Sequence, residues 1–137
     1  IIITSKNVSY TYQIIDSVSY IVTLIAETEF GCLDSISRVI TTPLVFYVPN
    51  SFTPDGNENN NEFTPVFSSK RKVENYSLNI YDRWGEIVFE TKDIDFGWDG
   101  TYNGEPLMAS DYWFTVDYSE PQTGEQKVFR SHFSLKR

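Results

Sequence analysis

The sequence predicts an all-β domain, built as a sandwich of about seven short strands, on three observations. Aromatic residues make up 16% of the 137 residues, with nine Tyr and ten Phe, and aromatic and β-branched residues favour strands. Several runs alternate apolar and polar residues, which places one face of each strand in a core. Turn residues separate these runs, and no run has the spacing of an amphipathic helix. Short strands with regular turns are typical of a β-sandwich.

The first part of the chain predicts one hairpin. Residues 18–26 alternate as a strand, Gly31 and Cys32 follow in a turn, and residues 35–41 return as a second strand. Pro43 then interrupts the pattern, and a new apolar run begins at Leu44. We therefore expect a boundary between residues 1–43 and residues 44–137.

The second part predicts a series of short strands joined by tight turns. The expected strands are residues 44–48, 63–67, 76–81, 86–90, 110–119 and 125–135. Gly85 can take the positive φ that a hairpin turn needs, and Asn103-Gly104 is a strong type I′ turn signal. A turn containing Gly124 joins the last two strands into the final hairpin.

Charge and composition exclude several functions. The formal charge of −8 argues against binding to a nucleic acid, because phosphate contacts need clustered Lys and Arg. No apolar stretch is long enough to span a bilayer as a helix. The first residues lack the features of a signal peptide, so we expect the chain to be the C-terminal fragment of a larger protein. Cys32, the single cysteine, would then find any partner upstream.

Four ordered motifs resemble a known family. Residues 49–63, P-N-S-F-T-P-D-G followed by N-N-E-F, are similar to the opening of the gliding-motility-associated C-terminal domain of Bacteroidetes, the type B signal of the type IX secretion system. Further matches are Y-D-R-W-G at 81–85, W-D-G-T-Y-N-G at 98–104, and the terminus at 133–137. The family-motif residues are Pro49, Asn50, Phe52, Thr53, Pro54, Gly56, Tyr81, Arg83, Trp84, Gly85, Trp98, Asp99, Gly100, Asn103 and Gly104.

The resemblance carries expectations about fold and function. It implies an immunoglobulin-like β-sandwich in residues 44–137, and residues 1–43 resemble the last strands of a PKD-type immunoglobulin-like domain, which would contribute extra strands. It implies a non-enzymatic signal that directs a large cargo protein through the periplasm and across the outer membrane, to the cell surface or medium. The implied partner is the type IX secretion machinery, including a PorP/SprF-type outer-membrane protein.

The Asn-rich loop is a candidate calcium site. Calcium takes six to eight oxygen ligands, and the loop offers side-chain oxygens from Asp55, Asn57, Asn59, Asn61 and Glu62. The alternative is a polar turn that satisfies its own backbone and is pinned at its ends by Phe52 and Phe63. No other cofactor is expected.

The tryptophans and the last strand are candidate contact residues. We expect Trp84 and Trp98 to be core residues, because a small domain needs large buried aromatics. Trp113 alternates with its aromatic neighbours, so we expect it to contact a partner, together with Phe133 and Leu135 on the terminal strand. The alternative function is an adhesive or carbohydrate-binding module, whose site would be formed by Trp84, Trp98, Trp113 and the Asn-rich loop.

Catalysis has little support in the sequence. His132, the single histidine, lies in the middle of a predicted strand, where a histidine is more often structural. No pattern joins it to a nucleophile or to an acid.

Overall fold

The computed structural model describes residues 2–11, 19–41, 44–57, 59–70, 73–121 and 123–137. It divides the chain into two compact units, Ile1–Pro43 and Leu44–Arg137. The predicted strand start at Val18 and the predicted boundary at Pro43 lie outside the described residues.

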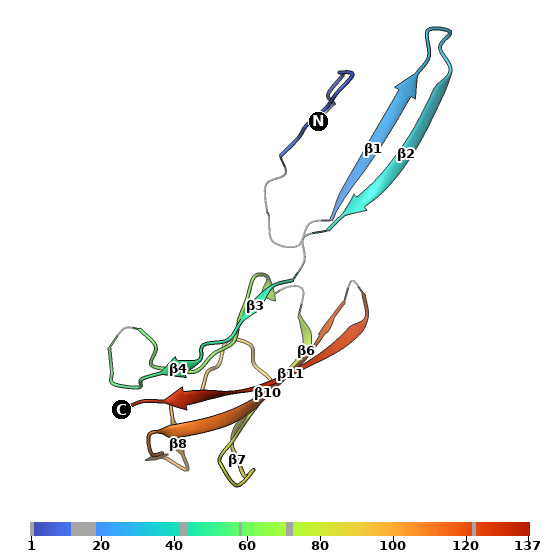
Figure 1. The fold of residues 1–137 in the computed structure, drawn as a ribbon. Helices are drawn as coiled ribbons and strands as arrows, with labels where there is room; N and C mark the ends of the chain where they lie inside the picture. Colours follow the sequence, from blue (N-terminus) through green and yellow to red (C-terminus); the bar gives the residue numbers. More distant parts are fainter. Residues whose placement is uncertain (1, 12–18, 42–43, 58, 71–72, 122) are drawn as a thin grey trace. The chain divides into compact units, whose positions relative to one another are not determined.

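The first unit contains one antiparallel hairpin (Figure 1). Its strands are β1 (Tyr20–Glu27) and β2 (Leu33–Ile40), paired without interruption from Tyr20 opposite Ile40 to Glu27 opposite Leu33. The turn between them is closed by hydrogen bonds between Thr28 and Cys32. Both faces of the hairpin carry exposed apolar side chains, which are Ile21, Leu24, Ile25, Leu33, Ile36, Val39 and Ile40.

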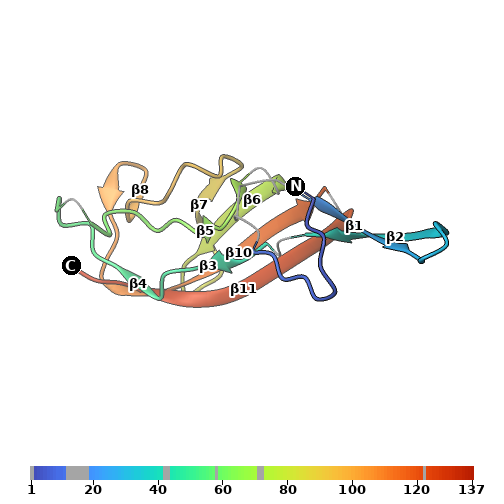
Figure 2. The same ribbon diagram turned by 90° about the horizontal axis from the view of Figure 1, so that it is seen from above.

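The second unit is built on a five-stranded sheet. Its strands are β4 (Ser51–Phe52), β6 (Glu74–Tyr81), β7 (Ile87–Thr91), β10 (Ser110–Glu120) and β11 (Glu125–Leu135). Their order is β4-β11-β10-β6-β7. Neighbours pair antiparallel, except that β4 runs parallel to the carboxyl end of β11 (Figure 2).

The described residues of this unit also form two short strand pairs and one isolated bridge. β3 (Phe46–Tyr47) pairs with β5 (Val66–Phe67), and β8 (Thr101–Tyr102) pairs with β9 (Glu105–Pro106). Phe63 and Trp98 form the isolated antiparallel bridge.

The core lies between the sheet and these short pairs. Alternate side chains of β6, β10 and β11 are buried on one face of the sheet, as the period of two in a strand requires. They are Tyr76, Leu78, Ile80, Tyr112, Phe114, Val116, Tyr118, Phe133 and Leu135. Rings from the short pairs and the bridge pack onto them: Phe67 contacts Tyr118 and Phe63 stacks on Phe133. This packing of two layers confirms the predicted all-β sandwich.

Several short strands differ from their predicted bounds. The strand predicted for residues 44–48 covers only Phe46–Tyr47, and that for 63–67 covers only Val66–Phe67. Pro49 and Pro65 have no N–H for a ladder, which shortens pairing near each of them. β4, which lies inside the first motif, was not predicted, because two residues leave no alternating pattern.

Candidate functional site

Trp98 contacts residues of two other motifs: Phe52 in the first motif and Phe133 at the terminus. Its side chain is 1% exposed, its indole N–H donates to the Thr101 carbonyl at 2.8 Å, and its backbone exchanges two hydrogen bonds with Phe63. The indole ring lies 5.7 Å from the ring of Phe52 and 5.0 Å from that of Tyr112, between centroids. The expectation that Trp98 is a core residue is confirmed.

The Asn-rich loop is tied to the core at both ends and bonded within itself. Phe52 and Phe63 are buried, as predicted for its two anchors. The Asp55 carboxylate accepts from the backbone N–H and the side-chain amide of Asn57, at 3.0 and 2.7 Å, and the Asn61 side-chain oxygen accepts from the Gly56 N–H at 2.9 Å. Two of the proposed ligands therefore already accept hydrogen bonds from the loop. These contacts favour the self-satisfied turn, while calcium at the loop stays a prediction.

The Y-D-R-W-G motif forms the turn between β6 and β7. One Asp82 carboxylate oxygen accepts from the backbone N–H groups of Trp84 and Glu86, both at 2.9 Å. The Trp84 side chain is 78% exposed, and the Arg83 guanidinium lies 4.9 Å from its ring centroid. The expectation that Trp84 is a core residue is wrong, because a residue at the tip of this turn projects beyond the sheet.

The W-D-G-T-Y-N-G motif forms a second ordered turn and a hairpin. The Asp99 carboxylate accepts from the backbone N–H and the hydroxyl of Thr101, at 3.0 and 2.7 Å. Asn103 and Gly104 have φ of 54° and 81°, the two positive values that a type I′ turn requires. The reversal predicted at Asn103-Gly104 is therefore confirmed.

Arg137 fastens the end of the chain to this hairpin. Its guanidinium donates to the Leu107 carbonyl at 2.8 Å and to the Gly100 carbonyl at 3.0 Å. Gly100 has φ of 81°, and a Cβ there would approach Leu135, Arg137 and Pro54 to 3.2–3.3 Å. Glycine is thus needed both for the backbone conformation and for the close contact. No pattern in the sequence connects Arg137 with Gly100, so sequence reasoning did not find this clasp.

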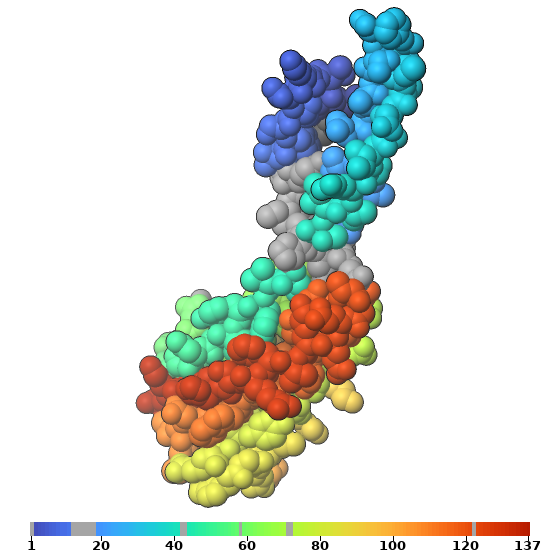
Figure 3. All heavy atoms as spheres, turned by 45° about the vertical axis from the view of Figure 1, so that its right-hand side comes forward, coloured from blue at the N-terminus to red at the C-terminus, as the bar shows by residue number. Residues whose placement is uncertain are grey.

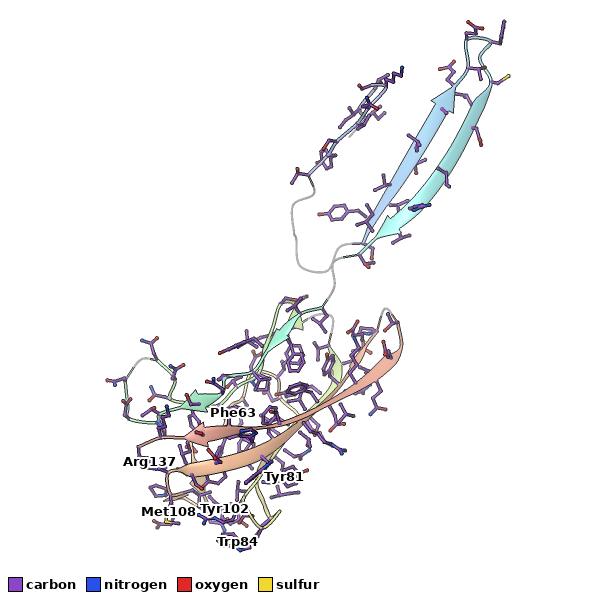
Figure 4. The ribbon with its side chains drawn as sticks, in the orientation of Figure 1. Phe63, Tyr81, Trp84, Tyr102, Met108 and Arg137 are labelled. Carbon is purple, nitrogen blue, oxygen red and sulfur yellow. The ribbon has the colours of Figure 1, made fainter. Side chains whose placement is uncertain are left out.

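A shallow pocket of about 180 Å³ lies beside the β6–β7 turn. Figure 4 shows Trp84, Tyr102 and Met108 gathered at this end of the unit. The acidic residues Asp82, Glu86 and Asp111 also line it. The pocket joins two of the family motifs at one surface.

The outer face of the sheet carries Trp113. It pairs with Tyr81 on β6 and with His132 on β11, and it is 46% exposed, which leaves it accessible for the predicted partner contact. Phe133 and Leu135 are 1% and 2% exposed. The predicted contact through these two side chains is therefore wrong, because alternation on β11 directs them into the core.

Burial changes the acidity of the core tyrosines. Desolvation raises the pKa of Tyr76, and the nearby Asp93 charge raises it further. Desolvation likewise raises the pKa of Tyr112 and of Tyr118. The Tyr112 hydroxyl donates to the Met108 carbonyl at 3.0 Å, whereas the Tyr76 hydroxyl has no hydrogen-bond partner among the described residues.

The described residues contain no cluster of three or more His, Cys, Asp or Glu side chains that could hold a metal ion. His132 is exposed on the outer face of β11, and Cys32 is exposed with a free thiol. In the part of the chain that is described, no helix has the length and apolar character of a membrane span.

Comparison with known proteins identifies the family. No curated protein matches the chain. Residues 46–133 match the family described as the CHU_C type IX secretion signal domain. This match spans more than half of the chain and contains the first three motifs. The chain belongs to the CHU_C type IX secretion signal domain family.

Proposed function

We propose that Leu44–Arg137 is a non-enzymatic sorting domain that marks a large cargo protein for passage from the periplasm across the outer membrane, and for delivery to the cell surface or medium. Membership of a secretion-signal family means that the domain is a sorting signal and interacts with the secretion machinery. The cargo, the periplasmic route and a PorP/SprF-type outer-membrane partner go beyond that membership. They form part of the proposal.

The observation that carries this proposal is the family match over a unit that is compact by itself. A fold alone does not specify a function, so the shared motifs matter more than the sandwich. In this unit they build two turns that are closed by carboxylate hydrogen bonds, and a pocket on the surface. A domain that is compact by itself can present this surface whatever cargo is attached to it.

The test is export of a reporter fused to Leu44–Arg137 in a host with a type IX secretion system. We expect the fused reporter in the medium or at the cell surface, and the reporter alone in the periplasm. A strain without the secretion machinery provides the control for leakage. Equal release of both reporters in the competent host would refute the proposal.

The choice of variant follows from the core. Deletion of residues 133–137 would remove the buried Phe133 and Leu135, so loss of export would report misfolding. Two substitutions test the need for folding directly: Trp98→Ala, which we expect to unfold the domain and stop export, and Lys136→Ala, which changes an exposed side chain and should matter less. Export of Trp98→Ala at the wild-type level would show that the folded surface is not needed.

A carbohydrate-binding module is the second candidate, favoured by the exposed Trp84 beside the pocket. An exposed indole can stack on an apolar ligand face, and carboxylates of the same pocket can accept hydrogen bonds. Trp98 cannot take part, because it is buried. Binding of the isolated domain to a glycan array, abolished by Trp84→Ala with folding intact, would support this candidate over the sorting domain.

A further inference from the structure

We infer that the outer edge of β11, along residues 126–132, is a docking site for an extended acidic segment of a partner protein, which adds to the five-stranded sheet as a sixth strand. The inference rests on the proposed function, because the partner would belong to the machinery that recognises the domain. Beyond that function, the inference gives the place of the contact and the charge of the partner segment.

The first observation is the open backbone of this edge. β10 pairs with β11 along its full length, whereas β4 pairs only with Ser134 and Leu135. The N–H groups of Ser134 and Lys136 donate toward β4, to the carbonyls of Asn50 and Phe52. In a regular strand, N–H groups two residues apart point to the same side. Those of residues 126, 128, 130 and 132 therefore point outward, and no described strand pairs with them.

Figure 2 shows β11 along the border of the unit, with β4 beside only its carboxyl end. In Figure 3 the orange-red part of the chain, which includes β11, forms an exposed band across the surface of the same unit. At about 3.4 Å per residue, the open stretch has room for a short strand.

The second observation is that this edge lacks three of the usual protections. Natural proteins protect edge strands with charged side chains, by making them short, by bulges or by proline, and of these β11 has only the charged side chains of Lys127 and Arg130. The opposite edge follows this rule, since β7 has five residues and a register shift against β6. β11 has 11 residues, an uninterrupted register with β10 and no proline. A long and regular edge of this kind is suited to strand addition.

The third observation is an apolar contact already in place at the edge. Val128 and Phe129 are 49% and 41% exposed. The Phe129 ring is held edge-on against Phe46, at 5.2 Å between centroids, and contacts Phe114. A strand added here would cover both side chains. Little side-chain entropy would be lost at Phe129, because its ring is already packed on one side.

The fourth observation is charge, and it selects the partner. The chain has a net charge of −8, yet residues 126–132 carry Lys127 and Arg130 and no acidic side chain. Lys127 pairs with Glu120 at 2.7 Å, whereas Arg130 is exposed and has no ion pair within the described residues. Opposite charge favours an acidic segment and disfavours a basic one.

The direct test adds a probe peptide to the full chain and follows amide hydrogen exchange by NMR. The probe is a peptide of about ten residues in which Glu and Val alternate, and the control replaces each Glu by Lys. We expect the Glu peptide to slow exchange at Val128 and Arg130 by about tenfold, and the Lys peptide to have no effect. No slowing, or equal slowing by both peptides, would overturn the inference.

Two variants separate the backbone from the charge. Val128→Pro removes an outward N–H and leaves the hydrogen bonds to β10, which the alternate residues make; Arg130→Glu reverses the free charge. We expect both to abolish the slowing. Arg83→Glu, at the exposed turn beyond the other edge, is the matched control and should retain it. If Val128→Pro does not fold, as judged by its melting curve, Arg130→Glu alone decides.

Export separates this inference from the proposed function. A wild-type reporter fusion that is not exported contradicts the proposed function, whatever the peptides do. Export of the wild type together with equal export of Arg130→Glu leaves the sorting signal intact and overturns docking at this edge. A dimer that forms with rising concentration and is lost in Val128→Pro would make the occupant a second copy of this chain, and would also overturn the inference.

Discussion

The hairpins β1–β2 and β10–β11 have the same local structure and opposite surroundings. Both are antiparallel and pair without a register shift. In β10 one face is buried against an aromatic layer, whereas in β1–β2 apolar residues such as Leu24 and Ile36 remain exposed. Strand pairing therefore needs only a local sequence pattern, whereas the stability of a hairpin needs a second layer that buries one of its faces.

The strongest test of this comparison removes the second layer at its centre. Trp98→Ala should lower the free energy of unfolding of Leu44–Arg137 by about 3–5 kcal/mol, because it leaves a cavity and a carbonyl without its donor. Leu24→Ala, in the exposed first hairpin, should change the free energy of unfolding of its own unit, Ile1–Pro43, by less than about 0.5 kcal/mol. Urea denaturation followed by near-ultraviolet circular dichroism measures both. Similar costs would mean that the first hairpin is covered in the native protein.

The Arg137 clasp is the second feature that β1–β2 lacks. Arg137→Ala should cost about 1.5 kcal/mol, because it removes two charge-assisted hydrogen bonds to carbonyls at a partly exposed position. Lys136→Ala keeps its backbone hydrogen bond to Phe52 and should cost less than about 0.5 kcal/mol. The same denaturation assay compares them. Equal values would show that the clasp does not hold in solution.

Two buried tyrosines differ in whether their hydroxyl group has a hydrogen-bond partner. Tyr112→Phe should destabilise the unit by about 1 kcal/mol, because the Met108 carbonyl loses its donor. Tyr76→Phe should be neutral or stabilising, because the Tyr76 hydroxyl is buried without a described partner. Melting temperatures at neutral pH measure the difference. A larger loss for Tyr76→Phe would reveal a partner for its hydroxyl.

Alkaline pH should weaken the unit that contains the buried tyrosines. Burial raises the pKa of Tyr76, Tyr112 and Tyr118 above the ordinary value, which is about 10. Below that pH the three hydroxyl groups stay protonated in both the folded and the unfolded chain, so the free energy of unfolding does not change. As the pH rises through it, the unfolded chain releases protons that the folded chain retains, so stability falls. Melting curves at rising pH should show a smaller fall for Tyr76→Phe than for the wild type.

The smallest effect is expected at the Asn-rich loop. Because Asp55 and Asn61 already accept hydrogen bonds within it, EDTA should leave the melting temperature unchanged. A ligand that binds only the folded state must raise it. A rise with added calcium, lost in Asp55→Asn, would instead establish the calcium site.

Much of the fold could be predicted from the sequence. The strands of the final hairpin and the turn at Asn103-Gly104 follow from alternation and turn chemistry. These features depend on neighbours along the chain. The family, too, was predictable, because its motifs are contiguous stretches.

Other features depend on residues distant in sequence, and only the tertiary structure decided them. Trp84 and Trp98 stand in similar motifs, yet one is at the tip of a turn and the other under the sheet. Two residues of β4 pair with the far end of the chain, and Arg137 reaches Gly100. A local pattern states which residues need a partner. Which partner each one meets depends on where the strands lie when the layers pack.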